Sequence, residues 1–359
     1  KIIAITGSCG KTTLKELLGN SLKKISKVSI SPKSYNNKYG VPLSLFNLSH
    51  NDDYGVLEVG MDKKGEIDKL SKIINPDVSV ITNINYAHAK NFKNIKDIAL
   101  AKSEIIYNTR SNGFIVLNAD DNFFKLHKKI ALKKNLKVIS FGIKSHESDI
   151  KFLKIEKKEK KFLISIKIEN KKKYFLISNN FQSNIYNILA AITVMNIYIN
   201  TLKLSKNIFM NFETPPGRGD FLKIKIDKKN INLIDESYNS NPLSLKSAII
   251  NYDKIDSKKS KKYLLLGDML ELGNHSKKLH QSIIPIINKT KIHKVFVKGN
   301  KIKLIFNKLL KSKKGRILIN KSQIIDLIQN DLNNNDYLMI KASNATGLNK
   351  IVKYIKGLN

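Results

Sequence analysis

The clearest chemical signal in this 359-residue sequence lies near its start, where an apolar run passes into a glycine-rich loop. Backbone N–H groups in such a loop, together with the positive end of the following helix, bind phosphate oxygens. Lys11 can neutralise β- and γ-phosphates, and the Thr12 hydroxyl can ligate Mg²⁺. The motif is a short form, T-G-x-x-G-K-T, of the common phosphate-binding loop, which has glycine where Ile5 stands. We therefore predict a nucleotide site, with Cys9 as a small filler, formed by Gly7, Ser8, Cys9, Gly10, Lys11, Thr12 and Thr13.

Three further residues could supply a metal site, although each also has an ordinary structural interpretation. Glu58 follows an apolar run and precedes Gly60, so its carboxylate suits Mg²⁺ if the run is a strand next to the phosphate loop. Taken alone, Glu58 could equally be a solvated loop acid. His88 follows another apolar run, and a lone histidine is usually structural. Lys102 lies in a helical pattern, and spacing alone does not single it out.

These candidates lie beside short apolar runs, so the fold must bring the ends of those runs together. Runs at 1–5, 56–59, 78–83 and 114–118 alternate with helical patterns. Strands alternating with helices form a mostly parallel sheet with helices on both faces. Alternating runs within 152–177 predict a small antiparallel extension, and a helix is expected at 184–199.

A proline-rich stretch, Thr214-Pro215-Pro216-Gly217, is the clearest linker signal in the chain. After it, the alternation of strands and helices resumes. We therefore expect an α/β chain of two domains: a central P-loop-type domain at 1–213 and a second, Rossmann-like domain at 214–359. The strands of the second domain are expected at 231–235, 263–267, 294–297, 316–319 and 337–340.

Composition narrows the functional classes. No apolar run reaches the ~18 residues that a membrane span requires. The single cysteine excludes an intrachain disulfide and favours a reducing, cytoplasmic compartment. The net charge of +36 invites a nucleic-acid interpretation, but only three of the 65 basic residues are arginine, the fork-shaped group preferred for phosphate and base recognition. Because Lys, Asn and Ile all have A/T-rich codons, base composition accounts for the charge, and we expect neither nucleic acid nor membrane as a partner.

The ordered motifs resemble those of the Mur ligases, ATP-dependent enzymes that form amide bonds in the peptidoglycan peptide. Motifs of the wider family are Thr6-Gly7-x-x-Gly10-Lys11-Thr12, Glu58-Val59-Gly60, Thr82-Asn83-Ile84 with His88, Lys102-Ser103-Glu104-Ile105, and Asn184-x-x-Asn187-x-x-Ala190-Ala191. More specific stretches resemble the MurF type, which joins D-alanyl-D-alanine to UDP-N-acetylmuramoyl-tripeptide. They are Asn36-Asn37-x-x-Gly40-Val41-Pro42-Leu43, Asp235-Glu236-Ser237-Tyr238-Asn239-Ser240-Asn241-Pro242 and Gly267-Asp268-Met269-Leu270-Glu271-Leu272-Gly273.

The resemblance implies a role for each motif. Lys11 and Thr12 would bind the ATP phosphates and one Mg²⁺, while Glu58 and His88 would bind a second Mg²⁺. Lys102 matches a lysine that family members carry in carbamylated form, which turns a cation into an anionic oxygen ligand. The resemblance implies nucleotide contacts for Asn184 and Asn187 of the first domain. It implies the same for Arg218 and Asp235 of the second domain, which would close over ATP.

Substrate contacts are implied as well. Asn36 and Asn37 match a loop near the acceptor, and Asn239 and Asn241 should lie near the incoming dipeptide in the amino-substrate domain. The sequence starts with Lys1 at the ATP-binding strand, so we expect the N-terminal UDP-sugar domain of the MurF type to be missing from it. Ser183 stands where many relatives have histidine, and 341–344 replaces a segment that often carries arginine.

The resemblance implies an ATP-dependent ligase, expected to act as a monomer, that works through an acyl phosphate. Another ligase of the same superfamily, adding a single amino acid or extending folate with glutamate, is the nearest alternative. A nucleotide-dependent switch protein would instead turn over ATP without stimulation by an amine. A nucleic-acid protein would bind DNA with steep salt dependence.

Overall fold

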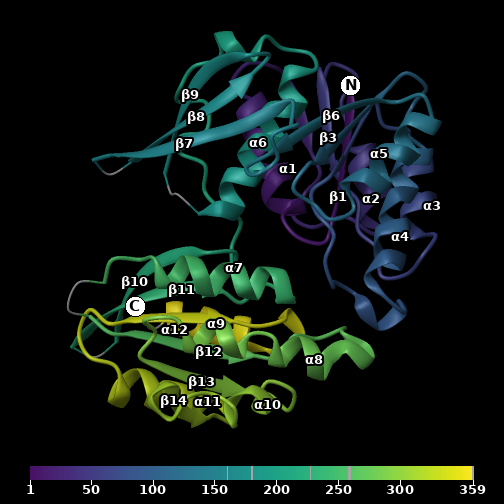
Figure 1. The fold of residues 1–359 in the computed structure, drawn as a ribbon. Coiled ribbons are helices and arrows are strands. Elements are labelled where there is room, and N and C mark those ends of the chain that lie inside the picture. Colours follow the sequence, from purple (N-terminus) through teal and green to yellow (C-terminus); the bar gives the residue numbers. More distant parts are fainter. Residues whose placement is uncertain (160, 179–180, 227, 258–259, 358–359) are drawn as a thin grey trace. The chain divides into compact units, whose positions relative to one another are not determined.

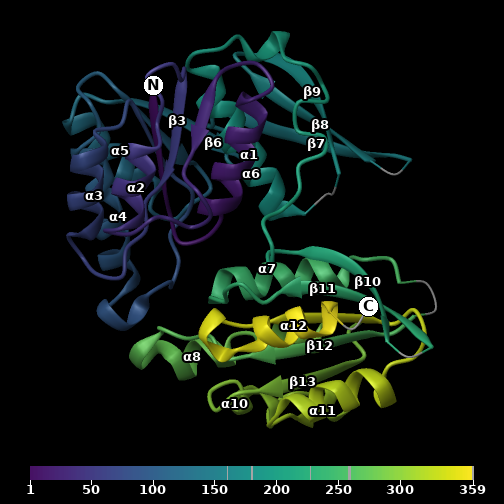
Figure 2. The ribbon, with the colours of Figure 1, turned by 180° about the vertical axis from the view of Figure 1, so that it is seen from behind.

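The computed structural model describes residues 1–159, 161–178, 181–226, 228–257 and 260–357. The chain forms two compact units, the N-terminal unit Lys1–Glu213 and the C-terminal unit Thr214–Asn359, each built around its own sheet (Figures 1 and 2). The change from one unit to the next falls at the proline-rich stretch. None of the helices among the described residues has the length and apolarity to cross a membrane.

The sheet of the N-terminal unit has nine strands in the order β2-β3-β1-β4-β5-β6-β7-β8-β9. The strands from β2 to β7 run parallel, whereas β8 and β9 pair antiparallel. This confirms the predicted α/β class with a mostly parallel sheet. The strands are β1 (Ile2–Thr6), β2 (Val28–Ile30), β3 (Tyr54–Glu58), β4 (Val78–Ile81), β5 (Phe114–Asn118), β6 (Lys137–Gly142), β7 (Ile150–Lys158), β8 (Lys161–Ile168) and β9 (Lys171–Ile177).

Helices cover both faces of this sheet (Figure 1). They are α1 (Lys11–Leu22), α2 (Gly40–Phe46), α3 (Glu66–Ile74), α4 (Ile95–Tyr107), α5 (Phe124–Lys133) and α6 (Gln182–Asn196), with the short 3₁₀ turns η1 (Ala89–Asn91) and η2 (Thr201–Lys203). On one face, α1 and α6 share an apolar core with the antiparallel strands, to which Ile5, Leu18, Phe175 and Leu189 contribute. The extension therefore covers α6.

The C-terminal unit has six strands in the order β10-β11-β15-β12-β13-β14, with β10 and β11 antiparallel and the rest parallel. The strand expected at 316–319 lies two residues earlier, and it carries a bulge, because the two steps from Val295 to Val297 of β13 oppose three steps from Lys314 to Ile317. The strands are β10 (Asp220–Ile226), β11 (Lys229–Glu236), β12 (Lys262–Gly267), β13 (Lys294–Lys298), β14 (Lys314–Ile317) and β15 (Tyr337–Lys341).

The central strand β12 is buried on both faces of the second sheet, to which its successive side chains point in turn. Tyr263 and Leu265 of β12 join the core beneath α11 and α12, while Leu264 and Leu266 are fully buried on the other face. The helices and turns are α7 (Pro242–Asp253), η3 (Gly273–His275), α8 (Ser276–Gln281), α9 (Ile284–Asn288), α10 (Lys303–Phe306), η4 (Lys311–Lys313), α11 (Lys321–Asp326), the π-helical η5 (Leu327–Asp331), η6 (Asn344–Thr346) and α12 (Leu348–Lys356).

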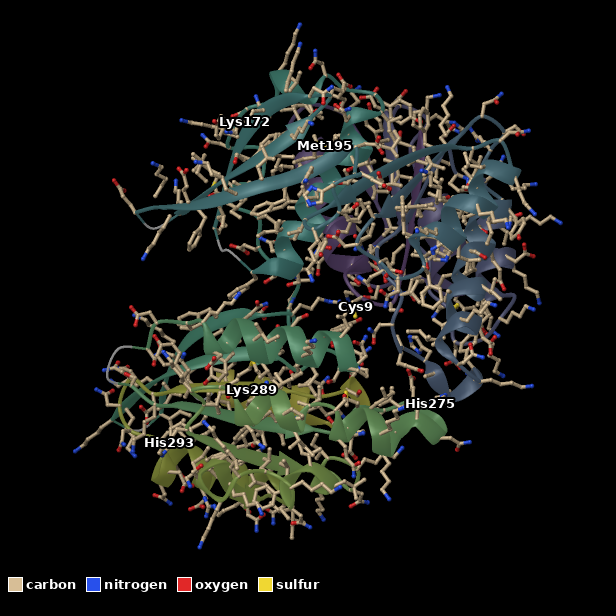
Figure 3. All side chains as sticks on the ribbon, in the orientation of Figure 1. Cys9, Lys172, Met195, His275, Lys289 and His293 are labelled. Carbon is tan, nitrogen blue, oxygen red and sulfur yellow. The ribbon has the colours of Figure 1, made fainter. Side chains whose placement is uncertain are left out.

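Exposed lysines occur along the whole length of both units, for example Lys172 of the N-terminal unit and Lys289 of the C-terminal unit (Figure 3). Three of the buried lysines are almost completely enclosed, because Lys15, Lys102 and Lys341 are at most 1% exposed. A buried ammonium group is costly unless it is paired or hydrogen-bonded. Each of these three lysines therefore requires an explanation in terms of its neighbours.

Candidate nucleotide and metal site

The phosphate loop, residues 6–13, connects β1 to α1 through two glycines with positive φ. Gly7 has φ +142° and Gly10 has φ +83°, conformations that side chains with a Cβ rarely adopt. A Cβ on Gly7 would lie 1.9 Å from Oγ1 of Thr82, and one on Gly10 would lie 2.9 Å from Oδ1 of Asn187. The helix that follows has no side-chain N-cap, so its first N–H groups are suited to an anionic ligand.

The segment after β4 fixes this loop. The Ser8 N–H donates to the carbonyl of Asn83 at 2.9 Å, and the Cys9 N–H donates to Oδ1 of Asn83 at 3.1 Å. In return, the Thr82 hydroxyl donates to the Cys9 carbonyl at 2.6 Å. The Thr82-Asn83-Ile84 motif therefore fixes the backbone of the phosphate loop.

Lys11 and Thr12, the first two residues of α1, point their polar groups to different partners. The Lys11 ammonium donates to the Gly7 carbonyl at 3.0 Å and so lies at the loop. The buried Thr12 hydroxyl donates to Oε2 of Glu58 at 2.7 Å. Glu58 is the last residue of β3, which pairs with β1. Its carboxylate therefore lies beside the phosphate loop, as predicted. Thr13, the next residue of α1, is half-buried.

Glu58 is a buried carboxylate without a cation. It is 1% exposed, and its second oxygen accepts from Nδ2 of Asn36 at 2.7 Å. Among the described residues, no lysine or arginine lies within ion-pair distance of it. Buried charges are normally paired or coordinate metals, and Mg²⁺ prefers oxygen donors such as a carboxylate and a hydroxyl. Thr12 and Glu58 therefore fit the metal ion that the motif implies.

Asn36 and Asn37 have different surroundings although they are adjacent. Asn36 contacts Glu58 with its side chain and accepts from the Gly60 N–H at 2.8 Å with its carbonyl. Oδ1 of Asn37 accepts instead from the N–H groups of Tyr39 and Gly40, at 3.1 and 2.9 Å, and so supports the start of α2. Asn36 thus contacts the candidate metal ligand Glu58, and Asn37 shapes the turn beside it.

Lys102 lies on α4 and is 1% exposed. No hydrogen bond or ion pair joins its ammonium to any residue that the structure describes. Burial lowers the pKa of Lys102 well below its usual value, and the neighbouring Lys11 ammonium lowers it further. The neutral amine, which is the form that reacts with CO₂, is thereby favoured, and the unpartnered buried nitrogen fits the carbamate that the motif implies.

Glu104 lies two residues after Lys102 on α4. It is part of the motif Lys102-Ser103-Glu104-Ile105, and no role was predicted for it from the sequence. It accepts from the N–H groups of Gly65 and Asp68 at 2.8 and 3.1 Å, and so caps α3. Burial raises the pKa of Glu104. The acidic residue therefore fixes α4, and Lys102 with it, against α3.

His88 has a left-handed backbone with φ +55° and lies beside Asp62. Its Nδ1 is 3.6 Å from Oδ1 of Asp62, whose other oxygen is 3.5 Å from the Lys90 ammonium. Sequence reasoning missed Asp62. The available signal was its position in the loop that starts at Glu58, because acidic residues at the carboxyl ends of strands share one edge of the sheet.

The two asparagines of α6 reach the phosphate loop to different extents. Asn187 is 8% exposed and lies against Gly10, as the close approach to a Cβ at that position shows. Asn184, one turn earlier, is half-buried. Residues three apart lie on the same face of a helix, so both face the side of α6 that meets the loop.

In the C-terminal unit, Arg218 and Asp235 lie at neighbouring positions. Arg218 lies two residues before the start of β10, which pairs with the end of β11 that carries Asp235. The Arg218 guanidinium lies 4.1 Å from the centre of the Tyr238 ring, a cation–π contact. Asp235 is 4% exposed and accepts from the Ser237 hydroxyl at 2.6 Å and the Lys356 ammonium at 2.9 Å.

Three loops meet at the carboxyl ends of β11, β15 and β12. The buried Lys341 ammonium donates to Oε2 of Glu236 at 2.9 Å and to the Asn239 carbonyl at 3.1 Å. Ser343 links the loops, since its hydroxyl accepts from the Leu270 N–H at 2.9 Å and donates to the Ser240 carbonyl at 3.1 Å. This edge is where α/β sheets bind ligands.

Asn241 is the N-cap of α7. Its Oδ1 accepts from the Ser244 N–H at 2.9 Å, and its own N–H donates to the Ser244 hydroxyl at 3.0 Å, which completes a capping box. The side-chain oxygen of Asn241 is therefore used by the fold, and its contact with the dipeptide stays a prediction.

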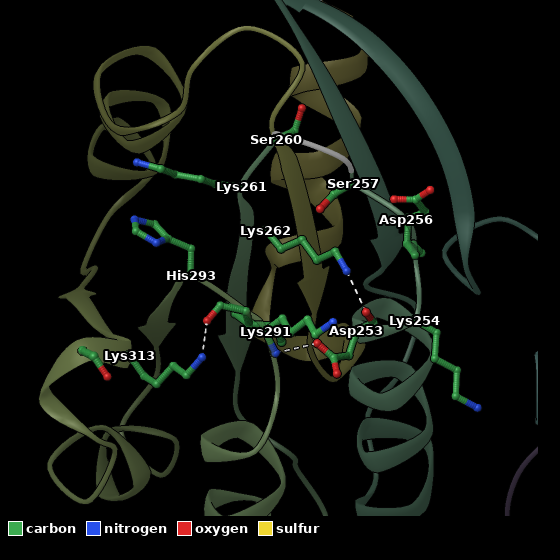
Figure 4. Close-up of a pocket in the computed structure, with 13 residues that line it drawn as sticks. Asp253, Lys254, Asp256, Ser257, Ser260, Lys261, Lys262, Lys291, His293 and Lys313 are labelled. Carbon is green, nitrogen blue, oxygen red and sulfur yellow. Dashed lines mark hydrogen bonds between the residues drawn. The ribbon is translucent and has the colours of Figure 1, made fainter.

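A cavity of about 690 Å³ opens at the opposite, amino-terminal edge of the same sheet (Figure 4). Two of its five lysines are bound to main-chain carbonyls: Lys262 donates to Asp253 at 2.7 Å, and Lys313 donates to Ile292 at 2.6 Å. Because this edge is the one that α/β sheets do not use for catalysis, we assign no part of the reaction to the cavity.

Comparison with known families follows the same two units. The Mur ligase middle domain matches residues 5–195, and the Mur ligase glutamate ligase domain matches residues 217–344. A UDP-N-acetylmuramoyl-tripeptide–D-alanyl-D-alanine ligase of Buchnera aphidicola subsp. Acyrthosiphon pisum (strain APS) is 33% identical over 362 residues, which cover 98% of this chain and 76% of that protein. The ligase of the same name from Bacillus subtilis (strain 168) is 30% identical over 356 residues. The match covers 98% of this chain and 75% of that protein.

Solved structures show the same likeness. The MurF ligase of Thermotoga maritima in complex with ADP superimposes with a TM-score of 0.86 at 25% identity, over 100% of this chain and 80% of that one. MurF from Acinetobacter baumannii gives a TM-score of 0.85 at 25% identity, over 99% of this chain and 76% of that one. The chain belongs to the Mur ligase family and, within that family, to its MurF type.

Proposed function

We propose that this chain is an ATP-dependent ligase that joins D-alanyl-D-alanine to UDP-N-acetylmuramoyl-tripeptide during peptidoglycan precursor synthesis. One observation carries the proposal: MurF-type ligases match nearly the whole chain. The phosphate loop with Thr12 against the buried Glu58 supports it, because that pair provides the phosphate and metal donors that the reaction requires.

The reaction consists of two displacements. A terminal carboxylate oxygen of the acceptor attacks the γ-phosphorus of ATP, the bond from that phosphorus to the β–γ bridging oxygen breaks, and ADP leaves. The amine of the dipeptide then attacks the carbonyl carbon of the acyl phosphate. The carbon–oxygen bond to phosphate breaks, inorganic phosphate leaves, and the nitrogen loses a proton as the amide forms.

Residues around the phosphate loop would stabilise the first displacement. The loop N–H groups and the Lys11 ammonium would bind the β- and γ-phosphates where negative charge gathers. Asn187 and Asn184 of α6 would contact the nucleotide beside Gly10. We also assign nucleotide binding to two residues of the C-terminal unit, Arg218 and Asp235.

Magnesium would be held by oxygen and nitrogen donors of the N-terminal unit. Thr12 and Glu58 suit one ion, and Glu58, His88 and modified Lys102 suit a second. Bound Mg²⁺ supplies the positive charge that offsets repulsion between a carboxylate and a triphosphate. Asn36 contributes by orienting Glu58, to which it donates a hydrogen bond.

We assign a carbamate to Lys102. The amine is buried, and its pKa is lowered by burial first and by Lys11 second. Addition of CO₂ would form a nitrogen–carbon bond and release one proton, which converts the group into an anion. Attraction to the neighbouring Lys11 would then replace repulsion.

Substrate contacts are assigned to residues of each unit. Asn36 and Asn37 are assigned to the acceptor side, and Asn239 and Asn241 to the dipeptide.

A ligase with this role supports cell-wall growth, and through it cell shape and division. The use of ATP and the single cysteine favour a cytoplasmic location.

A substrate panel tests the proposal. Phosphate release is measured with ATP, Mg²⁺ and the UDP-linked tripeptide, with D-alanyl-D-alanine, single amino acids or glutamate as the amine, and Lys11→Ala as the inactive control. Release that requires D-alanyl-D-alanine supports the assignment. Release with glutamate instead identifies another ligase, and ATP turnover that no amine stimulates identifies a nucleotide switch; either result overturns it.

A further inference from the structure

Lys15 is a fully buried lysine one helical turn after Lys11 and Thr12 on α1. Its ammonium makes three contacts that match its three N–H donors. It donates to the carbonyls of Ser31 and Lys33, each at 2.5 Å, and forms an ion pair with Oε1 of Glu16 at 2.9 Å. Burying a charged group costs free energy, and the site described above gives Lys15 no role that would account for this cost.

The two carbonyls belong to a segment without regular structure, residues 31–37, that reaches the metal site. Oγ of Ser31 accepts from the Glu58 N–H at 3.3 Å, and Oγ of Ser34 lies 3.4 Å from Oγ1 of Thr12. Asn36 ends the approach with its hydrogen bond to Glu58. The path of this segment therefore decides how the donors around Thr12 and Glu58 are arranged.

The segment takes a conformation that its own sequence does not favour. Lys33 has φ +46°, in the left-handed region that residues other than glycine and asparagine rarely adopt. Such a residue persists only where the surroundings fix it. In addition, the carbonyl dipoles of Ser31 and Lys33 converge on one point, and they would repel each other without a cation there.

We propose that Lys15 is a positioning residue for the metal site. Its ammonium draws the carbonyls of Ser31 and Lys33 against α1, and this fixes Ser34 on Thr12 and Asn36 on Glu58. Because Lys15 and Thr12 lie on the same helix, Lys15 fixes the position of the metal donors relative to the phosphate loop. The kinetic part of this proposal rests on the ligase function proposed above, whereas the structural part does not.

Three variants test the role. Lys15→Met keeps the length of the side chain but leaves two buried carbonyls and Glu16 without a cation. Lys15→Arg keeps the charge but replaces the compact ammonium by a planar group, and it serves if the methionine variant does not fold. Lys24→Met is the matched control, since Lys24 also donates to two carbonyls, those of Ile208 and Met210, at 2.7 and 3.1 Å, away from the site.

Amide hydrogen exchange of the full chain without ligands gives the first measurement. In Lys15→Met, we expect exchange in residues 31–40 and at Gly60 to speed up about tenfold or more. Exchange in β4, β5 and the antiparallel extension should stay at the wild-type rate, and Lys24→Met should leave residues 31–40 unchanged. Unchanged exchange in residues 31–40, or a uniform increase over the whole N-terminal unit, would overturn the proposal.

Kinetics gives the second measurement. Misplacing the donors should raise the Mg²⁺ concentration for half-maximal activity about tenfold and lower kcat about 10²-fold, with KM for ATP changed far less. Lys15→Arg should recover part of both losses, and a lysine that only stabilises the fold would leave the Mg²⁺ requirement unchanged. If the wild type fails to ligate D-alanyl-D-alanine while residues 31–40 respond as expected, the ligase function falls and the positioning role stands.

Discussion

His127 makes the stability of the N-terminal unit depend on pH in the acidic range. The side chain is 2% exposed on α5, and its Nε2 donates to the Ala99 carbonyl of α4 at 3.0 Å. Burial lowers the pKa of His127 to about 4, against 6.5 for an ordinary histidine, and the bond to Ala99 only partly opposes this. Between these values the unfolded chain binds more protons than the folded chain, so stability is lost as pH falls from 6.5 towards 4.

The size of the effect follows from the shift in pKa. Each unit corresponds to about 1.4 kcal/mol, so the free energy of unfolding should fall by about 2 kcal/mol between about pH 7.5 and pH 5, and by about 3 kcal/mol below pH 4. Because Ala99 precedes Lys102 by one turn of α4, the loss should appear first where α5 packs on the helix that carries Lys102.

Amide exchange of α4 and α5, corrected for the intrinsic pH dependence of exchange, measures this opening free energy. His127→Gln keeps a donor for the Ala99 carbonyl but cannot take up the proton, so its opening free energy should vary less with pH by the same 2 kcal/mol or so. His146→Gln, which replaces an exposed histidine of the same unit, is the matched control and should behave as wild type. Equal pH dependence in wild type and His127→Gln would refute the reasoning.

Three further predictions concern the site. Lys102→Ala should lose ligase activity about 10²-fold or more, with partial recovery when a short carboxylic acid is added; full activity without the acid would exclude the carbamate. Gly7→Ala should abolish nucleotide binding and lower the melting temperature, because the Cβ would lie 1.9 Å from Oγ1 of Thr82. Gly65→Ala, with φ +85° but nothing within 4 Å, should cost only the backbone strain of about 1–2 kcal/mol, and equal losses in the two variants would contradict the steric argument. Glu58→Gln keeps the size of the side chain and should lower Mg²⁺-dependent phosphate release about 10²-fold while ADP affinity without Mg²⁺ changes little; wild-type Mg²⁺ dependence would exclude Glu58 as a ligand.

The elements with strong patterns could be predicted from the sequence. The apolar runs that end near Thr6, Glu58 and Ile81 are adjacent parallel strands, so their polar ends share one edge. That rule places Glu58 at the same edge of the sheet as the phosphate loop, whereas the pairing of β3 with β1, which brings Glu58 beside Thr12, is known only from the structure. The strands β2, β6 and β10 were not expected. β2 is short, and β10 alternates with lysines in a way that also suits a solvated loop.

Residues whose partners lie in irregular segments could not be predicted in the same way. Lys15 binds the carbonyls of Ser31 and Lys33, and no periodic pattern encodes main-chain acceptors. Asp62 and Glu104 required knowledge of where a loop and a helix N-terminus lie in space. By contrast, the cap formed by Asn241 was available from the sequence, because asparagine before Pro242 with serine at 244 is a helix-start pattern.

Ammonium groups that bind main-chain carbonyls have a practical consequence for handling this protein. Lys24, Lys229 and Lys313 each bind two carbonyls, as Lys15 does beside the candidate metal site. Reductive methylation, a common aid to crystallising lysine-rich proteins, keeps the charge but substitutes methyl groups for N–H donors. The treatment would loosen these attachments along with the surface it is meant to alter, so site-directed removal of solvent-facing lysines is the safer route to crystals.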